Sequence, residues 1–397
     1  MPGVTMAHYR YLILGGGMTA DAAVRGIREL DADGSIGLIG SETDPPYARP
    51  PLTKGLWKGD PIDSVWKKTA EAGVDLLLGR RATVIDLSGK SVTDDRGAEY
   101  GFEKLLLATG GSPRSLPGGP PEIIYFRTLA DYGRLRALAD QGKSFAVIGG
   151  GFIGAEIAAA LALQGCKVTL LFPDEGIGSR LFPADLARFL VDYYREHGVE
   201  PQPGQRVKGV SPSGSQLVVE TESGLRTTAD VVVAGLGIVP NTALAEAIGL
   251  SVDDGIVVDE RLRTSHPDVF AAGDAANFLA PALGKRLRVE HEDNAVTMGR
   301  AAGRSMAGDA TPYTHLPFFY SDLFDLGYEA VGVMDPKEDL VADWKVPFRE
   351  GVVYYLSDGR VRGVLLWNTW DQVDAARELI ALPGPFGPGD LKGRLPK

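Results

Sequence analysis

Two glycine-rich turns, each between a strand-like run and a helix-like run, constrain the fold more than any other feature of this sequence. The first turn, Gly15-Gly16-Gly17, follows an apolar run at 9–14 and precedes a helical pattern over about 19–30. The second, Gly149-Gly150-Gly151, follows an apolar run at 144–148 and precedes a helical pattern over 152–163. A further strand is predicted after each helix, at 35–39 and at 167–172. The same strand–turn–helix–strand unit therefore occurs twice, which predicts an α/β fold with two Rossmann-like domains.

The spacing within both turns matches a dinucleotide-binding pattern. Its three small positions are filled by Gly15, Gly17 and Ala20 in the first turn, and by Gly149, Gly151 and Gly154 in the second. The first glycine makes a tight turn, the second lets the backbone approach a pyrophosphate, and the third position must be small for helix–strand packing. One copy is weak evidence for a ligand, but two copies in strand–helix context predict two nucleotide sites.

An acidic residue follows the second strand of each unit, where it can accept hydrogen bonds from ribose hydroxyls. Glu42 fills this place in the first unit and Asp174 in the second. A carboxylate at Asp174 would repel a 2′-phosphate, so NADH is favoured over NADPH. Arg180 lies close enough in sequence to weaken that preference.

Charge and cysteine content exclude several functions. The net charge of −11 argues against a general nucleic-acid binder. Cys166 is the only cysteine, so an internal disulfide and a dithiol redox pair are both excluded. We find no signal or transit peptide and no apolar run long enough to span a membrane, and we expect a soluble, cytoplasmic protein without a metal site.

Several further motifs resemble the FAD-dependent pyridine-nucleotide oxidoreductases of the glutathione-reductase structural family. The run from Thr264 to Asp274 resembles the motif whose aspartate binds the ribityl chain of FAD, and Ala108-Thr109-Gly110 resembles the crossing motif. The segment around Arg127 resembles the one that contacts the FAD pyrophosphate, and Gly237-x-x-Pro-Asn resembles a turn near the nicotinamide. The resemblance places FAD on the first glycine turn and NAD on the second.

Other segments are similar to two branches of that family, the ferredoxin reductases and the apoptosis-inducing factors. These segments are 46–54 (PYARPPLTK), 171–174 (LFPD), 288–291 (RVEH) and 319–322 (FYSD). His291 favours the apoptosis-inducing-factor branch. Tyr320 replaces the tryptophan of the family, and neither a leader nor a long insertion in the last domain is found, so a cell-death role is not predicted.

The resemblance implies a division into domains and a set of site residues. It implies an FAD-binding domain at 1–126 and 242–315, an NAD(H)-binding domain at 127–241 and a C-terminal α+β interface domain at 316–397. The residues expected to act in hydride transfer are Lys54, Phe152, Glu156 and His291, with Lys54 and Glu156 as a buried ion pair beside flavin N5. The residues expected on the FAD side are Gly15, Gly17, Ala20, Glu42, Arg49, Lys54, Val84, Ala108, Thr109, Gly110, Arg127, Asp274, Glu290, His291 and Tyr320. Those expected on the NAD side are Gly149, Gly151, Phe152, Gly154, Glu156, Asp174, Arg180, Gly237 and Glu290.

Three functions agree with this resemblance. The favoured one is an NADH oxidoreductase similar to apoptosis-inducing factor, with hydride passing to flavin N5 and a stable complex of reduced flavin with NAD⁺. The second is an NAD(P)H:ferredoxin reductase that passes electrons to an iron–sulfur protein. The third is an NADH-sensing protein with slow turnover, or a reductase of quinones or other small oxidants. A homodimer stays an open alternative to a monomer.

Overall fold

The computed structural model describes residues 6–395, and they form two compact units. The first unit contains residues 6–49, 62–112 and 240–317, and the second contains 50–61, 113–239 and 318–395. The chain passes between the units five times, after residues 49, 61, 112, 239 and 317. The third crossing lies within β7 (Gly111–Pro113) and the fourth within β16 (Ile238–Pro240). Each unit therefore draws on segments far apart in the sequence.

The first unit is built on a mostly parallel sheet of seven strands. Its order is β3-β2-β1-β6-β5-β4, with β18 also paired to β6. The parallel strands are β1 (Ala7–Leu14), β2 (Ile36–Gly40), β3 (Asp75–Leu78), β6 (Glu99–Leu107) and β18 (Val269–Ala271), and the antiparallel edge strands are β4 (Ala82–Asp86) and β5 (Ser91–Asp94). All five residues of β2 are buried, as expected for a parallel strand covered on both faces.

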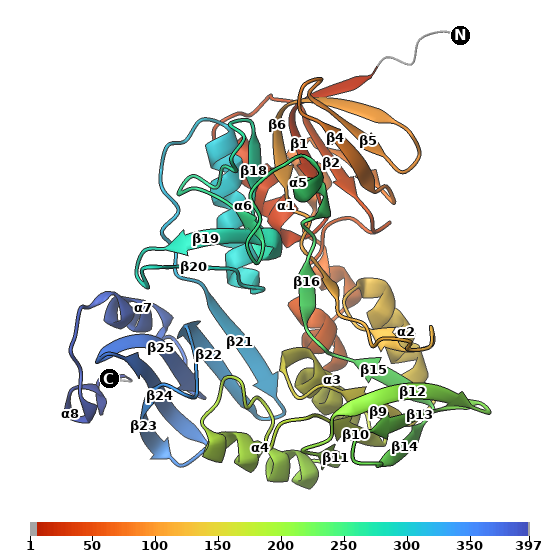
Figure 1. The fold of residues 1–397 in the computed structure, drawn as a ribbon, viewed down its shortest axis with the longest axis vertical. Helices are drawn as coiled ribbons and strands as arrows, with labels where there is room; N and C mark the ends of the chain where they lie inside the picture. Colours follow the sequence, from red (N-terminus) through yellow and green to blue (C-terminus); the bar gives the residue numbers. More distant parts are fainter. Residues whose placement is uncertain (1–5, 396–397) are drawn as a thin grey trace. The chain divides into compact units, whose positions relative to one another are not determined.

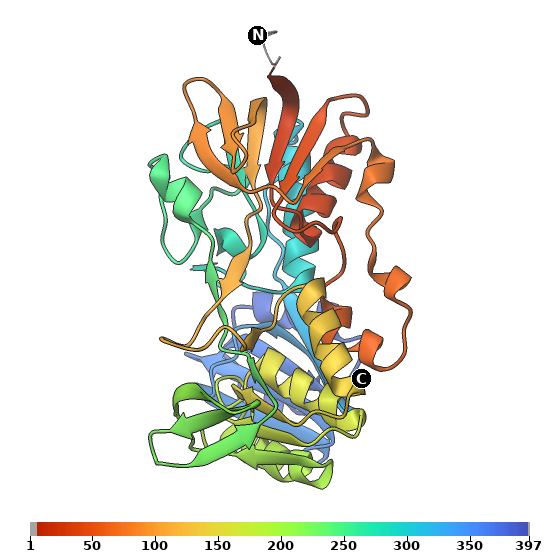
Figure 2. The same cartoon turned by 90° about the vertical axis from the view of Figure 1, so that its right-hand side faces the viewer.

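Two helices of the first unit, α1 (Met18–Arg28) and α6 (Glu292–Met306), lie side by side (Figures 1 and 2). Glycines make the close approach possible. A Cβ at Gly26 would come within 2.1 Å of the Arg300 carbonyl oxygen, and one at Gly303 within 2.0 Å of the Ala23 oxygen. The helix predicted at 19–30 is therefore present as α1. Its internal glycine, Gly26, is explained by the close packing of α1 against α6.

Short elements complete the first unit. They are the 3-10 turns η3 (Ile62–Val65), η4 (Thr69–Ala72) and η5 (Gly273–Ala275), the helix α5 (Ala243–Ala247), and the strands β17 (Ile256–Val257), β19 (Ala276–Ala280) and β20 (Lys285–Leu287). The turn η5 follows β18 directly, so it lies at the carboxyl end of the parallel sheet, where open α/β sheets bind their ligands.

The second unit contains a five-stranded parallel sheet in the order β11-β10-β9-β15-β8. Its strands are β8 (Ile124–Tyr125), β9 (Phe145–Ile148), β10 (Val168–Leu171), β11 (Val199–Gln202) and β15 (Val231–Ala234). The helices are α2 (Leu129–Asp140), α3 (Phe152–Leu163) and α4 (Ala184–Glu196), and a separate antiparallel sheet contains β12 (Val207–Ser213), β13 (Gln216–Thr221) and β14 (Arg226–Ala229). In both units the strand that precedes the glycine turn lies third in its sheet, with a crossover on each side.

The segment 50–61 belongs to the second unit and contains two 3-10 turns, η1 (Pro50–Thr53) and η2 (Gly55–Trp57). Pro50 and Pro51 lack backbone N–H groups, and the backbone of Lys54 leaves helical conformation between the two turns. Lys54 therefore projects from a break in the helical path.

The last part of the second unit is an antiparallel sheet in the order β21-β22-β25-β24-β23 (Figure 1). Its strands are β21 (Phe318–Leu323), β22 (Leu326–Gly332), β23 (Asp339–Val346), β24 (Glu350–Ser357) and β25 (Arg360–Trp367), followed by α7 (Val373–Ala381) and α8 (Pro388–Leu391). Trp367, Tyr354 and Tyr328 are fully buried here. The α/β fold with a C-terminal α+β region is confirmed, whereas the division into three domains with their nucleotides stays a prediction.

Candidate functional site

The first glycine turn has a backbone that only glycine tolerates. Gly15 has a φ of +132°, and a Cβ there would lie 2.0 Å from the carbonyl oxygen of Ala108. The amide of Gly15 donates to the Ile39 oxygen at 2.8 Å, which joins the end of β1 to β2. The turn therefore passes directly against the predicted crossing motif at the end of β6.

Gly17 leaves open space in front of helix α1. It is the N-cap of α1, with no side-chain cap, and a Cβ there would meet no described atom within 4 Å. Ala20 is fully buried, as expected for the third small position. The first N–H groups of a helix lack intrahelical partners and favour anions, so this turn fits a pyrophosphate.

Several predicted FAD-side residues meet near the carboxyl end of the first sheet. Glu42 accepts hydrogen bonds from Tyr47 at 2.5 Å and from Arg49 at 2.6 Å. Desolvation acts to lower the pKa of Arg49, but Tyr47, Glu42 and Asp274 together raise it. Asp274 lies in η5, close enough to influence Arg49 electrostatically. Glu42, Arg49 and Asp274, all predicted on the FAD side, therefore lie in one region, and their roles stay predictions.

His291 belongs to the same region and is held neutral. Desolvation by the surrounding protein lowers its pKa to about 4, against the opposing charges of Asp274 and Asp293. His291 is also the N-cap residue of α6. The preceding Glu290 forms an ion pair with Arg288 at 2.8 Å. At neutral pH the His291 imidazole can therefore donate or accept a hydrogen bond without bringing a charge.

The crossing motif is fixed by a reciprocal set of hydrogen bonds to Asn241. The Thr109 hydroxyl donates to the Asn241 carbonyl oxygen at 2.7 Å, and the Asn241 amide side chain donates to the Thr109 oxygen at 2.9 Å. The Asn241 backbone N–H donates to the Gly110 oxygen at 2.9 Å. Two motifs about 130 residues apart in sequence thus form one rigid connection.

In the second glycine turn all three small positions are glycines, and at two of them the structure leaves no room for a side chain. Gly149 has a φ of +115°, and a Cβ there would lie 2.3 Å from the Gly235 oxygen. A Cβ at Gly154 would lie 1.9 Å from the Gly149 oxygen. Gly151, the N-cap of α3, again has no described atom within 4 Å of a Cβ. The second turn therefore fits a second pyrophosphate.

Asp174 follows β10 and keeps its carboxylate available. Within residues 6–395 no hydrogen bond or ion pair engages that carboxylate, although its backbone oxygen accepts from Gly204 at 3.0 Å. Arg180 is exposed and has no ion-pair partner in the same range. A carboxylate at this end of a parallel strand can accept the two hydroxyls of a ribose.

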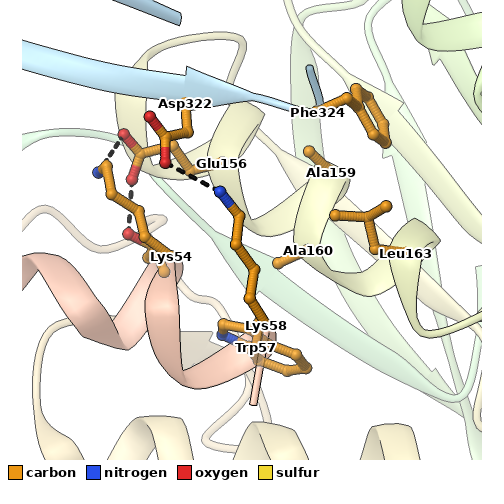
Figure 3. A pocket seen from close by; sticks show the side chains of 10 residues that line it. Lys54, Trp57, Lys58, Glu156, Ala159, Ala160, Leu163, Asp322 and Phe324 are labelled. Carbon is orange, nitrogen blue, oxygen red and sulfur yellow. Dashed lines mark hydrogen bonds and ion pairs between the residues drawn. The ribbon is translucent and has the colours of Figure 1, made fainter. Parts of the chain in front are cut away.

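Lys54 and Glu156 form the buried ion pair that was predicted, with an Nζ–Oε1 distance of 2.6 Å (Figure 3). The side chain of Glu156 is 4% exposed and that of Lys54 is 13% exposed. Glu156 also accepts hydrogen bonds from the Ser321 hydroxyl at 2.6 Å and the Thr53 hydroxyl at 2.5 Å. Three donors from two separate segments, residues 50–57 and β21, therefore stabilise one buried carboxylate.

Aromatic rings surround this ion pair. The Lys54 ammonium lies 5.3 Å from the centre of the Tyr320 ring, within cation–π range. Phe152, the first residue of α3, packs edge-on against Phe319 at 5.2 Å between ring centres. Burial, with a smaller contribution from the Glu156 charge, raises the pKa of Tyr194 and Tyr328 well above its usual value. Both phenols therefore stay protonated beside the carboxylate.

Sequence reasoning missed residues at two places. Thr53 and Ser321 were not predicted, although Ser321 lies in the FYSD segment that was noted for Tyr320. A basic hollow on the first unit was also missed; it is lined by Asp21, Ala22, Arg25, Trp66, Lys67, Val296 and Arg300. Nothing in the sequence places these three cations together, because they come from α1, the loop after η3 and α6.

Val84 is exposed on β4, Gly237 has a positive φ of +81°, and the Arg127 amide donates to Asp131 at the start of α2. Their assignments stay predictions. Cys166 is buried, and burial raises its pKa, so it is no reactive thiolate.

Comparison with known proteins shows similarity over nearly the whole chain. Residues 9–299 match the family described as pyridine nucleotide-disulphide oxidoreductase, and residues 302–347 and 341–382 match the C-terminal domain of mitochondrion-associated apoptosis-inducing factor. Apoptosis-inducing factor 1, mitochondrial, of Dictyostelium discoideum is 34% identical, over 94% of this chain and 78% of that protein.

The same comparison finds ferredoxin reductases. The 5,5′-dehydrodivanillate O-demethylase ferredoxin reductase subunit of Sphingobium sp. is 35% identical, over 90% of this chain and 89% of that protein. The crystal structure of a covalent putidaredoxin reductase–putidaredoxin complex matches with a TM-score of 0.90 and 31% identity, over 96% of this chain and 95% of that chain. Both branches that the sequence motifs resembled are therefore found among similar proteins.

Proposed function

Because the chain belongs to the pyridine nucleotide-disulphide oxidoreductase family, whose members depend on FAD and NAD(P)H, we propose that it is an NADH oxidoreductase in which bound FAD accepts hydride at N5 and passes electrons to a protein acceptor. The observation that carries this proposal is the pair of open glycine turns. Each places an uncapped helix N-terminus in front of free space, at Gly17 and at Gly151.

The first turn holds FAD and the second holds NADH. On the FAD side, Gly15, Gly17 and Ala20 receive the pyrophosphate, Glu42 the ribose and Asp274 the ribityl chain. This is supported by the cluster of Glu42, Arg49 and Asp274 at the carboxyl end of the first sheet. Since Cys166 is the only cysteine and is buried, the electrons leave without an internal disulfide.

Lys54 and Glu156 organise the reacting region. Glu156 holds the Lys54 ammonium at 2.6 Å, so the ammonium can stabilise negative charge at N5 in a place of low dielectric. Phe152 shields the same region until nicotinamide enters, which supports exclusion of water. Tyr320 would lie against the flavin. On the first unit, His291 stays neutral and so adds no charge there.

NADH is the preferred nicotinamide. The carboxylate of Asp174 has no partner among residues 6–395 and so stays free to accept ribose hydroxyls. The same carboxylate would repel a 2′-phosphate. Arg180, the nearest candidate to oppose it, is exposed and can turn toward solvent.

The acceptor is an acidic iron–sulfur protein of the ferredoxin type. Two similar proteins are named as a ferredoxin reductase subunit and as putidaredoxin reductase in complex with putidaredoxin. The basic hollow supports the same acceptor, since its lining has three cations against one carboxylate and includes an indole, Trp66. Arg25 pairs with Asp21 and Arg300 with Glu29, while Lys67 has no ion-pair partner in the described chain. An excess of positive charge around a concave surface steers an acidic partner.

Anaerobic titration with NADH tests the central claim. We expect purified protein to contain FAD, and its absorbance near 450 nm to bleach with one equivalent of NADH. A long-lived band at longer wavelength, destroyed only slowly by oxygen, would instead favour the redox-sensing function of the apoptosis-inducing-factor branch, which the C-terminal match over 302–382 supports. Protein that binds no flavin and shows no bleaching would contradict the proposal.

A charge reversal tests the acceptor. Lys67→Glu should raise the KM for a [2Fe–2S] ferredoxin about tenfold at low salt, with the difference shrinking as salt increases. Ferricyanide reduction should be unchanged. Lys285→Glu, on exposed β20 outside the hollow, is the matched control. Equal KM values in both variants would contradict docking at this hollow.

A further inference from the structure

A hollow extends from the buried ion pair toward the surface of the second unit. It is narrow, with about 20 Å³ of space that a water molecule can occupy, and Figure 3 shows its lining. Thr53, Lys54 and Glu156 form its polar inner end. Its wall includes Ala159 and Ala160 of α3, whose small side chains leave the space unfilled.

A second ion pair stands at the outer end of this hollow. Lys58 Nζ lies 3.0 Å from an Oδ of Asp322, and these side chains are 50% and 35% exposed. Both ion pairs join residues 50–61 to β21 or α3, and Asp322 directly follows Ser321, which donates to Glu156. A buried carboxylate and a solvent-exposed carboxylate therefore line one hollow (Figure 3).

The proposed function, on which this inference rests, requires a proton to leave the reacting region. NADH delivers a hydride, which is one proton and two electrons. Two one-electron acceptors take only the electrons, so NADH and two oxidised acceptors give NAD⁺, two reduced acceptors and one H⁺. A site that excludes water needs a path for that proton, and positioned carboxylates and single water molecules provide such paths.

We propose that the hollow is the exit for this proton, with Glu156 as its inner carboxylate and Asp322 as its outer one. Water in the hollow connects the two carboxylates. Such water needs a polar site with two to four partners, and Lys54, Glu156, Lys58 and Asp322 supply them. The aliphatic part of the lining keeps other polar groups away, so the path leads from one carboxylate to the other.

The other titratable groups around Glu156 do not offer this exit. Lys54 on the η1–η2 segment is its ion-pair partner, and Tyr320 on β21 lies against Lys54. Tyr194 on α4 and Tyr328 on β22 are fully buried, with a pKa raised well above its usual value. Lys58 on η2's C-terminal side faces Asp322 at the mouth. Asp322 is therefore the one carboxylate of the hollow's lining that reaches solvent.

A stopped-flow measurement of proton release tests the proposal. Holoenzyme reduced with one equivalent of NADH is mixed with excess ferricyanide in weak buffer with a pH-indicator dye, and proton appearance is timed. Bleaching of the flavin by NADH is timed separately. Asp322→Asn should slow proton release about tenfold or more while changing the bleaching rate less than twofold. A small proton carrier such as imidazole should restore the rate, which a structural defect would not allow.

Filling the hollow provides an independent variant. Ala160→Leu should slow proton release similarly, but imidazole should not rescue it, because the space itself is blocked. Asp140→Asn, which breaks the exposed 2.9 Å pair with Arg136, is the matched control and should behave as wild type. A crystal structure of flavin-free protein should show ordered water between Glu156 and Asp322, absent from Ala160→Leu.

The outcomes distinguish failure of the proton exit from failure of the proposed function. Unchanged proton release in both variants, with normal bleaching, overturns the exit; so does a dry hollow in the crystal structure. If NADH does not bleach the flavin of the wild-type protein, that result overturns the proposed function itself.

Discussion

Removing the Glu156 carboxylate is the most informative test of the second unit. Glu156 is nearly fully buried and accepts hydrogen bonds from Lys54, Thr53 and Ser321. Glu156→Leu keeps the approximate size but leaves the Lys54 ammonium buried with no carboxylate. Glu156→Gln keeps one acceptor oxygen and removes the charge. The two variants therefore separate the ion pair from the hydrogen bonds.

The expected magnitude follows from these contacts. Removing one partner of a buried ion pair costs about 3–5 kcal/mol, because the remaining charge is uncompensated. Lys54 is 13% exposed and adjoins the hollow, so it regains some hydration. We therefore expect Glu156→Leu to lose about 3 kcal/mol of unfolding free energy. Glu156→Gln should lose about 2 kcal/mol, since a bond to a charged group is worth about 1.5–3 kcal/mol.

Urea denaturation of flavin-free protein, followed by circular dichroism, measures these losses. A double variant strengthens the test, since Lys54→Met with Glu156→Leu removes both charges and should recover at least about 1 kcal/mol relative to the sum of the single changes. Asp192→Asn, which breaks an exposed ion pair with Arg195, should cost less than about 0.5 kcal/mol. Wild-type stability of Glu156→Leu, or strict additivity in the double variant, would refute the reasoning.

Three further variants probe the two nucleotide turns and their surroundings. Asp174→Ala should raise the KM for NADH and reduce the preference for NADH over NADPH about tenfold in kcat/KM; an unchanged ratio would contradict the ribose assignment. Gly154→Ala places a Cβ 1.9 Å from the Gly149 oxygen, so it should cost about 2 kcal/mol or more and weaken NADH binding, whereas Gly151→Ala, with no described atom within 4 Å, should keep wild-type stability in urea denaturation. His291 has its pKa lowered to about 4, so the unfolded chain takes up a proton between about pH 6.5 and 4 that the folded chain does not, and stability falls as the pH falls through that window. His291→Gln should remove about 2 kcal/mol of that acid-induced loss, and denaturation curves at pH 7 and pH 4.5 that shift equally in both proteins would rule this out.

The sequence predicted those parts of the fold that depend on local backbone chemistry. Gly15 and Gly149 occupy conformations with positive φ and lie against carbonyl oxygens, so their patterns could be read without a structure. The helix and strands around each turn were placed within a few residues, since their apolar runs are buried continuously. The Lys54–Glu156 pair was predicted only through family resemblance, because 102 positions separate the two residues.

The remaining site residues depend on packing that no local pattern records. Thr53 and Ser321 reach Glu156 because η1 and β21 both pack against α3, and each hydroxyl would be unremarkable on an exposed surface. The basic hollow likewise needs Arg25, Lys67 and Arg300, whose positions follow from the close contact of α1 and α6 and from the loop after η3. The spacing of these residues along the chain does not indicate which of them come into contact.

Helix α3 carries both the end of the second glycine turn and the buried Glu156 carboxylate. Its N-terminus at Gly151 faces open space, and Glu156 lies on its second turn, about 7.5 Å further along the axis at 1.5 Å per residue. An α-helix of 12 residues cannot shift one of these without the other. A nucleotide phosphate bound at Gly151 would therefore fix the position of Glu156 along the helix axis. Through the 2.6 Å ion pair it would also fix the position of the Lys54 ammonium. Tight binding and correct placement of the buried charge are consequently one structural event, so a variant that loosens the turn should disturb the ion pair before it unfolds the sheet.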